Sequence, residues 1–229
     1  MGYIGTKPSA VPLTSADITD GIITSAKIAD GTIVNADINA SAAIDASKLT
    51  GLSSDYVLLA TTNITSSTAS VSFDGYFSAT YKNYILYFTS LRPVTDDAKL
   101  YFRVRQSNAD VTSSGYGFAQ YGIYRQDAVG DGATTGGGNN TFAHIDYNNG
   151  LSNTSNYGGQ GTITIFNPLT TEYRLFQSHI TIFSPDETYA RMTSNLIRWS
   201  GNTTALSGFT LYFSTGNIAN GNFKLYGLK

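Results

Sequence analysis

The amino-acid sequence predicts an all-β protein in which an extended repetitive stalk precedes a jelly-roll-like β-sandwich head. Residues 16–50 repeat with a period of five. Residues 56–228 contain about ten short runs rich in Tyr, Phe, Ile and Thr, separated by turn residues. Only 13% of the residues are charged, so neutral side chains supply the polar surface, which is typical of strands and long loops. We therefore expect an N-terminal segment at 1–15, the stalk at 16–52 and the head at 53–229.

The stalk repeat has a small residue first and, in five consecutive units, isoleucine third. These isoleucines are Ile18, Ile23, Ile28, Ile33 and Ile38. On an α-helix, five residues advance a side chain by a full turn and about 140° more, so the isoleucines would scatter around the helix. In a straight strand, the odd spacing would place them on alternate faces. We therefore expect a chain that bends every five or ten residues, with Asp20-Gly21 and Asp30-Gly31 as turns, and that keeps its isoleucines inward.

One apolar residue in five cannot offset the entropy lost on ordering the stalk as a monomer. The repeat resembles the pentapeptide repeat, a single-chain β-helix, but seven units would make fewer than two coils. It more closely resembles the stalk repeats of phage fibres, in which three chains wrap together. That resemblance implies a homotrimer with the five isoleucines as its core. A flexible linker is the alternative, since the segment is rich in Ser, Ala and Thr.

The head is expected to contain ten strands joined by turns and loops. They are Tyr56–Thr61, Ala69–Phe73, Tyr84–Leu91, Lys99–Gln106, Phe118–Arg125, Thr162–Asn167, Leu175–Phe183, Ala190–Trp199, Phe209–Ser214 and Phe223–Leu228. Two long connections, Gln126–Asn140 and Tyr147–Gly161, are rich in Gly and Asn and are expected to be loops. A binding surface could vary in such loops without disturbing the core.

The head resembles the C-terminal domains of tail-fibre and other virion-appendage proteins from environmental, often marine, phages. The resemblance lies in residues 84–93 (YILYFTSLRP), 161–168 (GTITIFNP) and 213–229 (FSTGNIANGNFKLYGLK), together with the MGYIG start and the repeat. It implies a homotrimer that contacts other virion proteins through its N-terminus and binds the host cell surface, through glycan, with its head. Such a protein is assembled in the host cytoplasm and acts outside the cell as part of the virion. A capsid-attached head fibre or decoration protein is the alternative, because the chain is short for a tail fibre.

Several function classes are excluded by composition. The sequence has no cysteine, which removes disulfides, thiolate metal sites and cysteine nucleophiles. A net charge of -2 gives no basic surface for nucleic acid. No apolar run approaches the ~18 residues of a membrane span, so no membrane insertion is expected. We expect neither a metal nor a cofactor, because no run of acidic residues has the alternating pattern of a calcium loop and no phosphate-binding motif follows the glycine run.

Enzymatic activity is not expected either. His144 precedes Asp146 by two residues, but no Gly-x-Ser-x-Gly motif accompanies them. A glycan-degrading tailspike is the less favoured alternative, because no spacing singles out a carboxylate pair. Aromatic faces stack on sugar rings, so the expected receptor contacts are aromatic residues in or beside polar segments. They are Tyr116, Tyr147, Tyr157 and Trp199.

Overall fold

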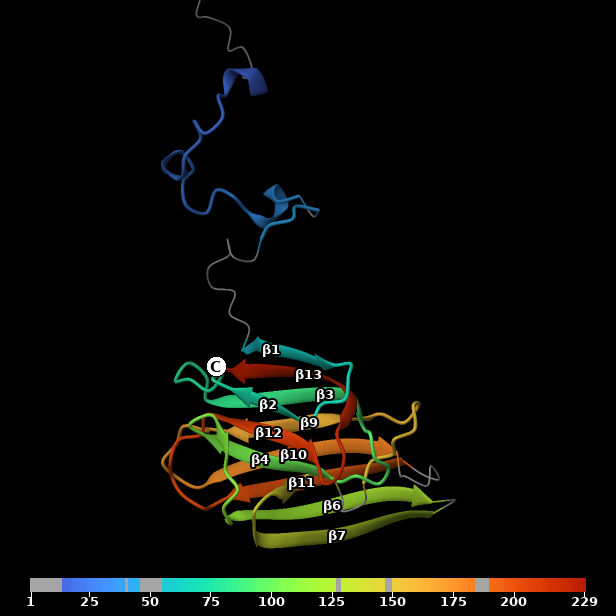
Figure 1. Ribbon diagram of the computed structural model, residues 1–229. Coiled ribbons are helices and arrows are strands. Elements are labelled where there is room, and N and C mark those ends of the chain that lie inside the picture. Colours follow the sequence, from blue (N-terminus) through green and yellow to red (C-terminus); the bar gives the residue numbers. More distant parts are fainter. Residues whose placement is uncertain (1–13, 40, 46–54, 127–128, 147–149, 184–189) are drawn as a thin grey trace, which may run out of the picture. The chain divides into compact units, whose positions relative to one another are not determined.

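The computed structural model describes residues 14–39, 41–45, 55–126, 129–146, 150–183 and 190–229 (Figure 1). The chain divides into two compact units, Met1–Ser53 and Ser54–Lys229. Within the described ranges there is no α-helix, and the strands form two antiparallel sheets. The predicted all-β class is confirmed.

The described part of the first unit is a series of turns that recur every ten residues. Its 3-10 turns are η1 (Ser15–Asp17), η2 (Ser25–Lys27) and η3 (Asn35–Asp37). In each, the backbone N–H of the third residue donates to the carbonyl three positions earlier, over 2.9–3.0 Å. Between them, Gly21 and Gly31 adopt φ of 77° and 78°, a left-handed conformation that is strained for other residues. The ten-residue period of the sequence is therefore a ten-residue period of backbone turns.

In a single chain, the described side chains of this unit lie in solvent. The five isoleucines of the repeat are between 37% and 54% exposed. Every residue between 14 and 45 whose burial the structure describes is exposed as well. Among the residues that the structure describes, the isoleucines that we expected to point inward therefore have no core to enter within one chain.

The second unit contains both sheets, which we name A and B (Figure 1). Within the described residues, sheet A has eight strands, in the order β1 (Tyr56–Ile64), β13 (Ile218–Leu228), β3 (Asn83–Pro93), β9 (Gly159–Phe166), β10 (Arg174–Phe183), β11 (Ala190–Trp199), β6 (Tyr116–Gln126) and β7 (Val129–Asn140). Sheet B has five, in the order β2 (Ser70–Asp74), β12 (Gly208–Phe213), β4 (Leu100–Gln106) and β5 (Ala109–Asp110), with β8 (Ala143–His144) also paired to β4. Each of the ten predicted strands is present.

The two sheets pack face to face around one aromatic core. Burial alternates strictly along β10, so every second side chain points into the sandwich. Phe102 of sheet B lies 4.9 Å from Phe176 of sheet A, measured between ring centroids. Phe73 stacks on Phe209 at 5.1 Å within sheet B and reaches Phe223 of sheet A at 6.1 Å. Each such buried side chain contributes about 1.5–3 kcal/mol to folding, so these rings hold the layers together.

One predicted loop is a strand. Most of Gln126–Asn140 forms β7, which pairs with β6 at the edge of sheet A. Five of its twelve residues are glycine, so the segment carries no alternation of apolar and polar side chains. Backbone hydrogen bonds to one neighbour are enough to form an edge strand, and the sequence gives little signal for them.

Candidate functional site

The outer face of sheet B is polar and joined by ion pairs and hydrogen bonds. Arg105 on β4 lies 2.5 Å from Asp74 on β2 and also pairs with Asp110 on β5. The Thr210 hydroxyl on β12 donates to the same Asp110 carboxylate over 2.6 Å. Ser72 and Thr210 are hydrogen-bonded at 2.9 Å across the β2–β12 pair. This network spans four strands and is typical of a solvent-exposed sheet face.

Partly buried aromatic rings extend this polar face. Tyr101 stacks on Phe142 at 4.1 Å and meets Tyr212 edge-on at 5.6 Å. The Arg103 guanidinium lies over the Tyr212 ring, 4.7 Å from its centroid, as in a cation–π contact. Burial raises the pKa of the Tyr212 phenol to about 12, so it stays neutral at physiological pH. These rings pack mainly against each other and against the sheet.

The outer face of sheet A is different, because large apolar side chains are exposed on it. Six of them, each between 40% and 51% exposed, define what we call the apolar face. They are Phe166 on β9, Leu175 on β10, Met192 and Leu196 on β11, and Tyr121 and Ile123 on β6. Among the described side chains that point outward from these four strands, Arg198 is the only Lys, Arg, Asp or Glu.

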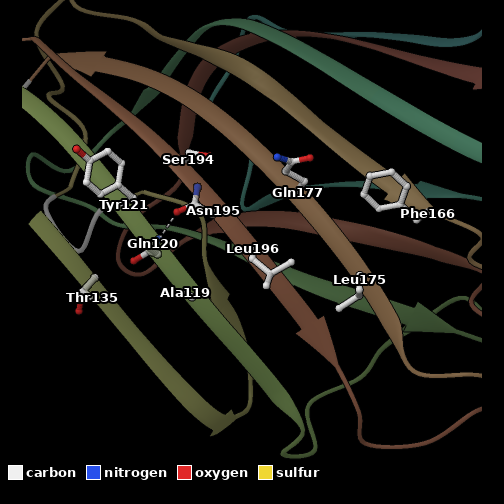
Figure 2. Close-up of a pocket in the computed structure, with 10 residues that line it drawn as sticks. All are labelled: Ala119, Gln120, Tyr121, Thr135, Phe166, Leu175, Gln177, Ser194, Asn195 and Leu196. Carbon is white, nitrogen blue, oxygen red and sulfur yellow. Dashed lines mark hydrogen bonds between the residues drawn. The ribbon is translucent and has the colours of Figure 1, made fainter. Parts of the chain in front are cut away.

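The apolar face is hollowed at its centre (Figure 2). The hollow has a volume of about 610 Å³ and is lined by residues from five adjacent strands. Figure 2 shows Tyr121 and Phe166 at opposite ends, with Ser194 and Gln177 between them and Leu196 and Leu175 along one side. A second hollow of about 240 Å³ adjoins the first, since Ala119 and Leu196 line both, and we call the two hollows together the groove. The groove offers mainly apolar contact.

A buried polar cluster lies on the inner side of the same strands. The Asn195 amide donates to Ser178 Oγ over 2.6 Å and to the Ile145 carbonyl over 2.9 Å. The Gln120 amide in turn donates to Asn195 Oδ1 over 2.7 Å. The cluster ties β6, β10 and β11 to the segment that follows β8. Its role is to satisfy polar groups inside the sandwich, so it fixes the strands that carry the groove.

His144 and Asp146 lie close together, as their spacing suggested. His144 Nδ1 is 3.7 Å from Asp146 Oδ1, which is too long for a hydrogen bond and leaves an electrostatic contact when the imidazole is protonated. Asp146 is completely buried, and its Oδ2 accepts a 2.8 Å hydrogen bond from the Leu100 N–H. Burial raises the pKa of this carboxyl. The arrangement places the carboxylate in the core, away from any substrate at the surface.

Two of the four expected receptor contacts are corrected by the structure. Tyr116 and Trp199 are completely buried and pack on each other, with ring centroids 4.6 Å apart. The Tyr116 hydroxyl donates to the Val111 carbonyl over 2.8 Å and accepts from the Val104 N–H over 3.1 Å. Both residues occupy inward positions of the β6–β11 pair, where they have no surface to offer a receptor.

The other two expected contacts have different outcomes. Tyr147 lies outside the described residues. Tyr157 is half-buried and packs on the exposed ring of Phe183, with centroids 4.6 Å apart and ring planes inclined by 32°. This pair joins the segment before β9 to the end of β10, and the neighbouring Ser155 and Asn156 are exposed. It combines aromatic surface with hydrogen-bonding groups.

The amino-acid sequence carries a signal for the apolar face in pairs of adjacent apolar residues. Leu175 directly precedes Phe176, and Leu196 directly precedes Ile197. In a strand, adjacent residues point to opposite faces, so each pair places one apolar side chain in the core and one outside. Such pairs indicate a strand with two apolar faces.

The described residues contain no cluster of three or more His, Cys, Asp or Glu side chains able to hold a metal ion. Nor does any helix among them have the length and apolar character needed to cross a membrane. No match to the chain was found among family models, curated proteins or solved structures.

Proposed function

We propose that this protein is a structural component of a bacteriophage virion, a homotrimeric fibre with a jelly-roll-like head that binds glycan on the host surface. The observation that carries the proposal is the isoleucine repeat. Its turns recur every ten residues, and its isoleucines are exposed in a single chain. A regular apolar series with nothing to cover it is expected where copies of one chain share a core.

The energetics favour a shared core. Burying the exposed half of one isoleucine contributes roughly 1 kcal/mol, because complete burial is worth about 1.5–3 kcal/mol. Five isoleucines in each of three chains give on the order of 15 kcal/mol, which offsets part of the entropy lost on ordering the stalk. The N-terminal segment at residues 1–15 then remains to contact other virion proteins.

Host binding would depend on several weak contacts acting together. Three heads on one stalk raise the overall affinity far above that of a single head. The Tyr157–Phe183 pair supplies aromatic surface for a sugar ring, and the exposed Ser155 and Asn156 beside it supply hydrogen bonds. We assign the head a binding role without a catalytic step, and no cofactor.

A binding assay with fluorescent full-length protein tests this proposal. The protein is applied to a panel of bacterial surface polysaccharides and to the cells that carry them. We expect specific binding that periodate oxidation of the glycan abolishes and protease treatment of the cells leaves intact. Tyr157→Ala should weaken binding at least tenfold. Tyr173→Ala, which removes a tyrosine of the head that is 62% exposed, should not change it.

Two results would contradict the proposal. Binding that is lost on protease treatment would make the receptor a protein. Release of reducing sugar ends from the polysaccharide would make the head an enzyme.

Antibody labelling of the virion, viewed by electron microscopy, distinguishes attachment of the fibre at the tail from attachment at the capsid.

A further inference from the structure

We propose that the apolar face of sheet A is the surface through which the heads of separate copies pack against one another. The inference rests on the proposed homotrimer and assigns its contact within the head. The occupant of the groove is therefore a second copy of this chain.

The outer faces of sheets A and B differ in polarity. An antiparallel sandwich normally presents polar side chains on both. Sheet B follows this rule with its Arg105 ion pairs. Sheet A instead presents Leu175, Met192 and Leu196 at the centre of its outer face. Exposed leucine and methionine in the middle of a sheet indicate a surface that another protein covers.

The apolar face also has the area that a protein interface needs at its centre. The six residues of the apolar face are about half exposed. With side-chain areas on the order of 150–200 Å², they leave roughly 500 Å² of apolar surface. A standard interface buries ~800 Å² from each partner, including its polar rim. The face is therefore large enough to form the centre of such an interface.

The distribution of charge also suits contact between copies. In a homotrimer the heads meet around a three-fold axis, so a charge near that axis would lie beside its own copies and repel them. Arg198, the one charged side chain described above for these strands, lines the second hollow but not the first. Its guanidinium folds over Gly117, where a Cβ would come within 3.3 Å of Arg198 Nη2. The lining of the first hollow therefore contains no Lys, Arg, Asp or Glu, which suits it to self-association.

The chemistry of the groove favours a protein over a sugar. Sugars need ring faces for stacking and a dense set of hydrogen-bonding partners. Here the two rings, Tyr121 and Phe166, lie at opposite ends. Leu196 and Leu175 line the space along one side of them, beside Ser194 and Gln177. A shared stalk would also hold the heads at millimolar effective concentration, so an interface of modest affinity would be occupied.

Cysteine labelling of the full-length protein tests the inference, because the chain has no cysteine of its own. Leu196→Cys places a thiol at the centre of the apolar face, and Val94→Cys places one at a control position of similar exposure, 48% against 51%. Both are treated with a bulky maleimide, and the mass of each is measured by light scattering. We expect Leu196→Cys to react at least tenfold more slowly than Val94→Cys in the native oligomer, and at the same rate in denaturant.

Each outcome supports or overturns the inference. A trimeric mass with equal labelling rates overturns the head contact and leaves the proposed homotrimer standing. A monomeric mass overturns both. Protection of Leu196→Cys that appears only when polysaccharide is added makes the groove a receptor site and overturns self-packing. Ser194→Cys, a nearly isosteric change on the same strand, repeats the comparison without removing an apolar side chain.

Discussion

Replacing Asp146 with Asn should change how the stability of the head depends on pH. The Asp146 side chain is completely buried, and its Oδ2 accepts the Leu100 N–H, whereas its Oδ1 has no hydrogen-bond partner. Burial removes water from the carboxylate and raises its pKa. Asparagine keeps an acceptor for the Leu100 N–H and removes the charge.

The sign and size follow from proton linkage. A carboxyl whose pKa is higher in the folded state binds its proton more tightly there than in the unfolded chain. Below the unfolded pKa of about 3.9 both states are protonated, and no penalty arises. As the pH rises from there to the folded pKa of Asp146, the parent loses stability by up to about 1.4 kcal/mol per pH unit. Asp146→Asn should lack this loss and become the more stable protein as the pH rises.

Urea unfolding from pH 4 to pH 8, followed by Trp199 fluorescence, measures the effect. Trp199 is the single tryptophan and is completely buried, so its emission reports on the core. Asp55→Asn removes an exposed carboxylate and serves as the charge-matched control. Repeating the series in a His144→Gln background separates the imidazole, 3.7 Å from Asp146, from the carboxyl itself. Parallel curves for the parent and Asp146→Asn between pH 4 and 7 would refute the reasoning.

Three other predictions address the core, a buried cation and the repeat. Phe102→Ala, at a fully buried ring between the sheets, should cost about 3–5 kcal/mol of unfolding free energy in urea titrations. Arg174→Met should cost about 1.5–3 kcal/mol, because the buried guanidinium donates four hydrogen bonds to loop carbonyls; an unchanged thermal midpoint would contradict this role. Replacing Ile23, Ile28 and Ile33 together with Asp should abolish assembly, as measured by sedimentation, because each carboxylate would enter the shared apolar core of the stalk. An unchanged oligomer would reduce the repeat to a linker.

Most of the strands were predictable from sequence, because buried and exposed side chains alternate along them. Side chains such as Phe176 and Ile180 recur at every second position of β10, and burial on one face of the sheet enforces this period. β7 could not be found in the same way. Its glycines have no side chains to alternate, and its pairing with β6 rests on backbone hydrogen bonds.

The candidate site was less predictable, because it depends on which face of a strand meets the second sheet. Sequence spacing correctly suggested that His144 and Asp146 lie close together. It could not show that Tyr116 and Trp199 point inward, since both lie at the ends of strands beside polar turns. The apolar face required the register of β10 and β11, which places Leu175 and Leu196 on one surface.

The mass of the full-length protein in solution tests the central claim most directly. Light scattering coupled to size exclusion, at two concentrations tenfold apart, gives this mass without reference to shape. We expect three times the 24.5 kDa of the single chain at both concentrations. A mass of 24.5 kDa would contradict the shared isoleucine core, the packing of the heads and the multivalent mechanism of host binding.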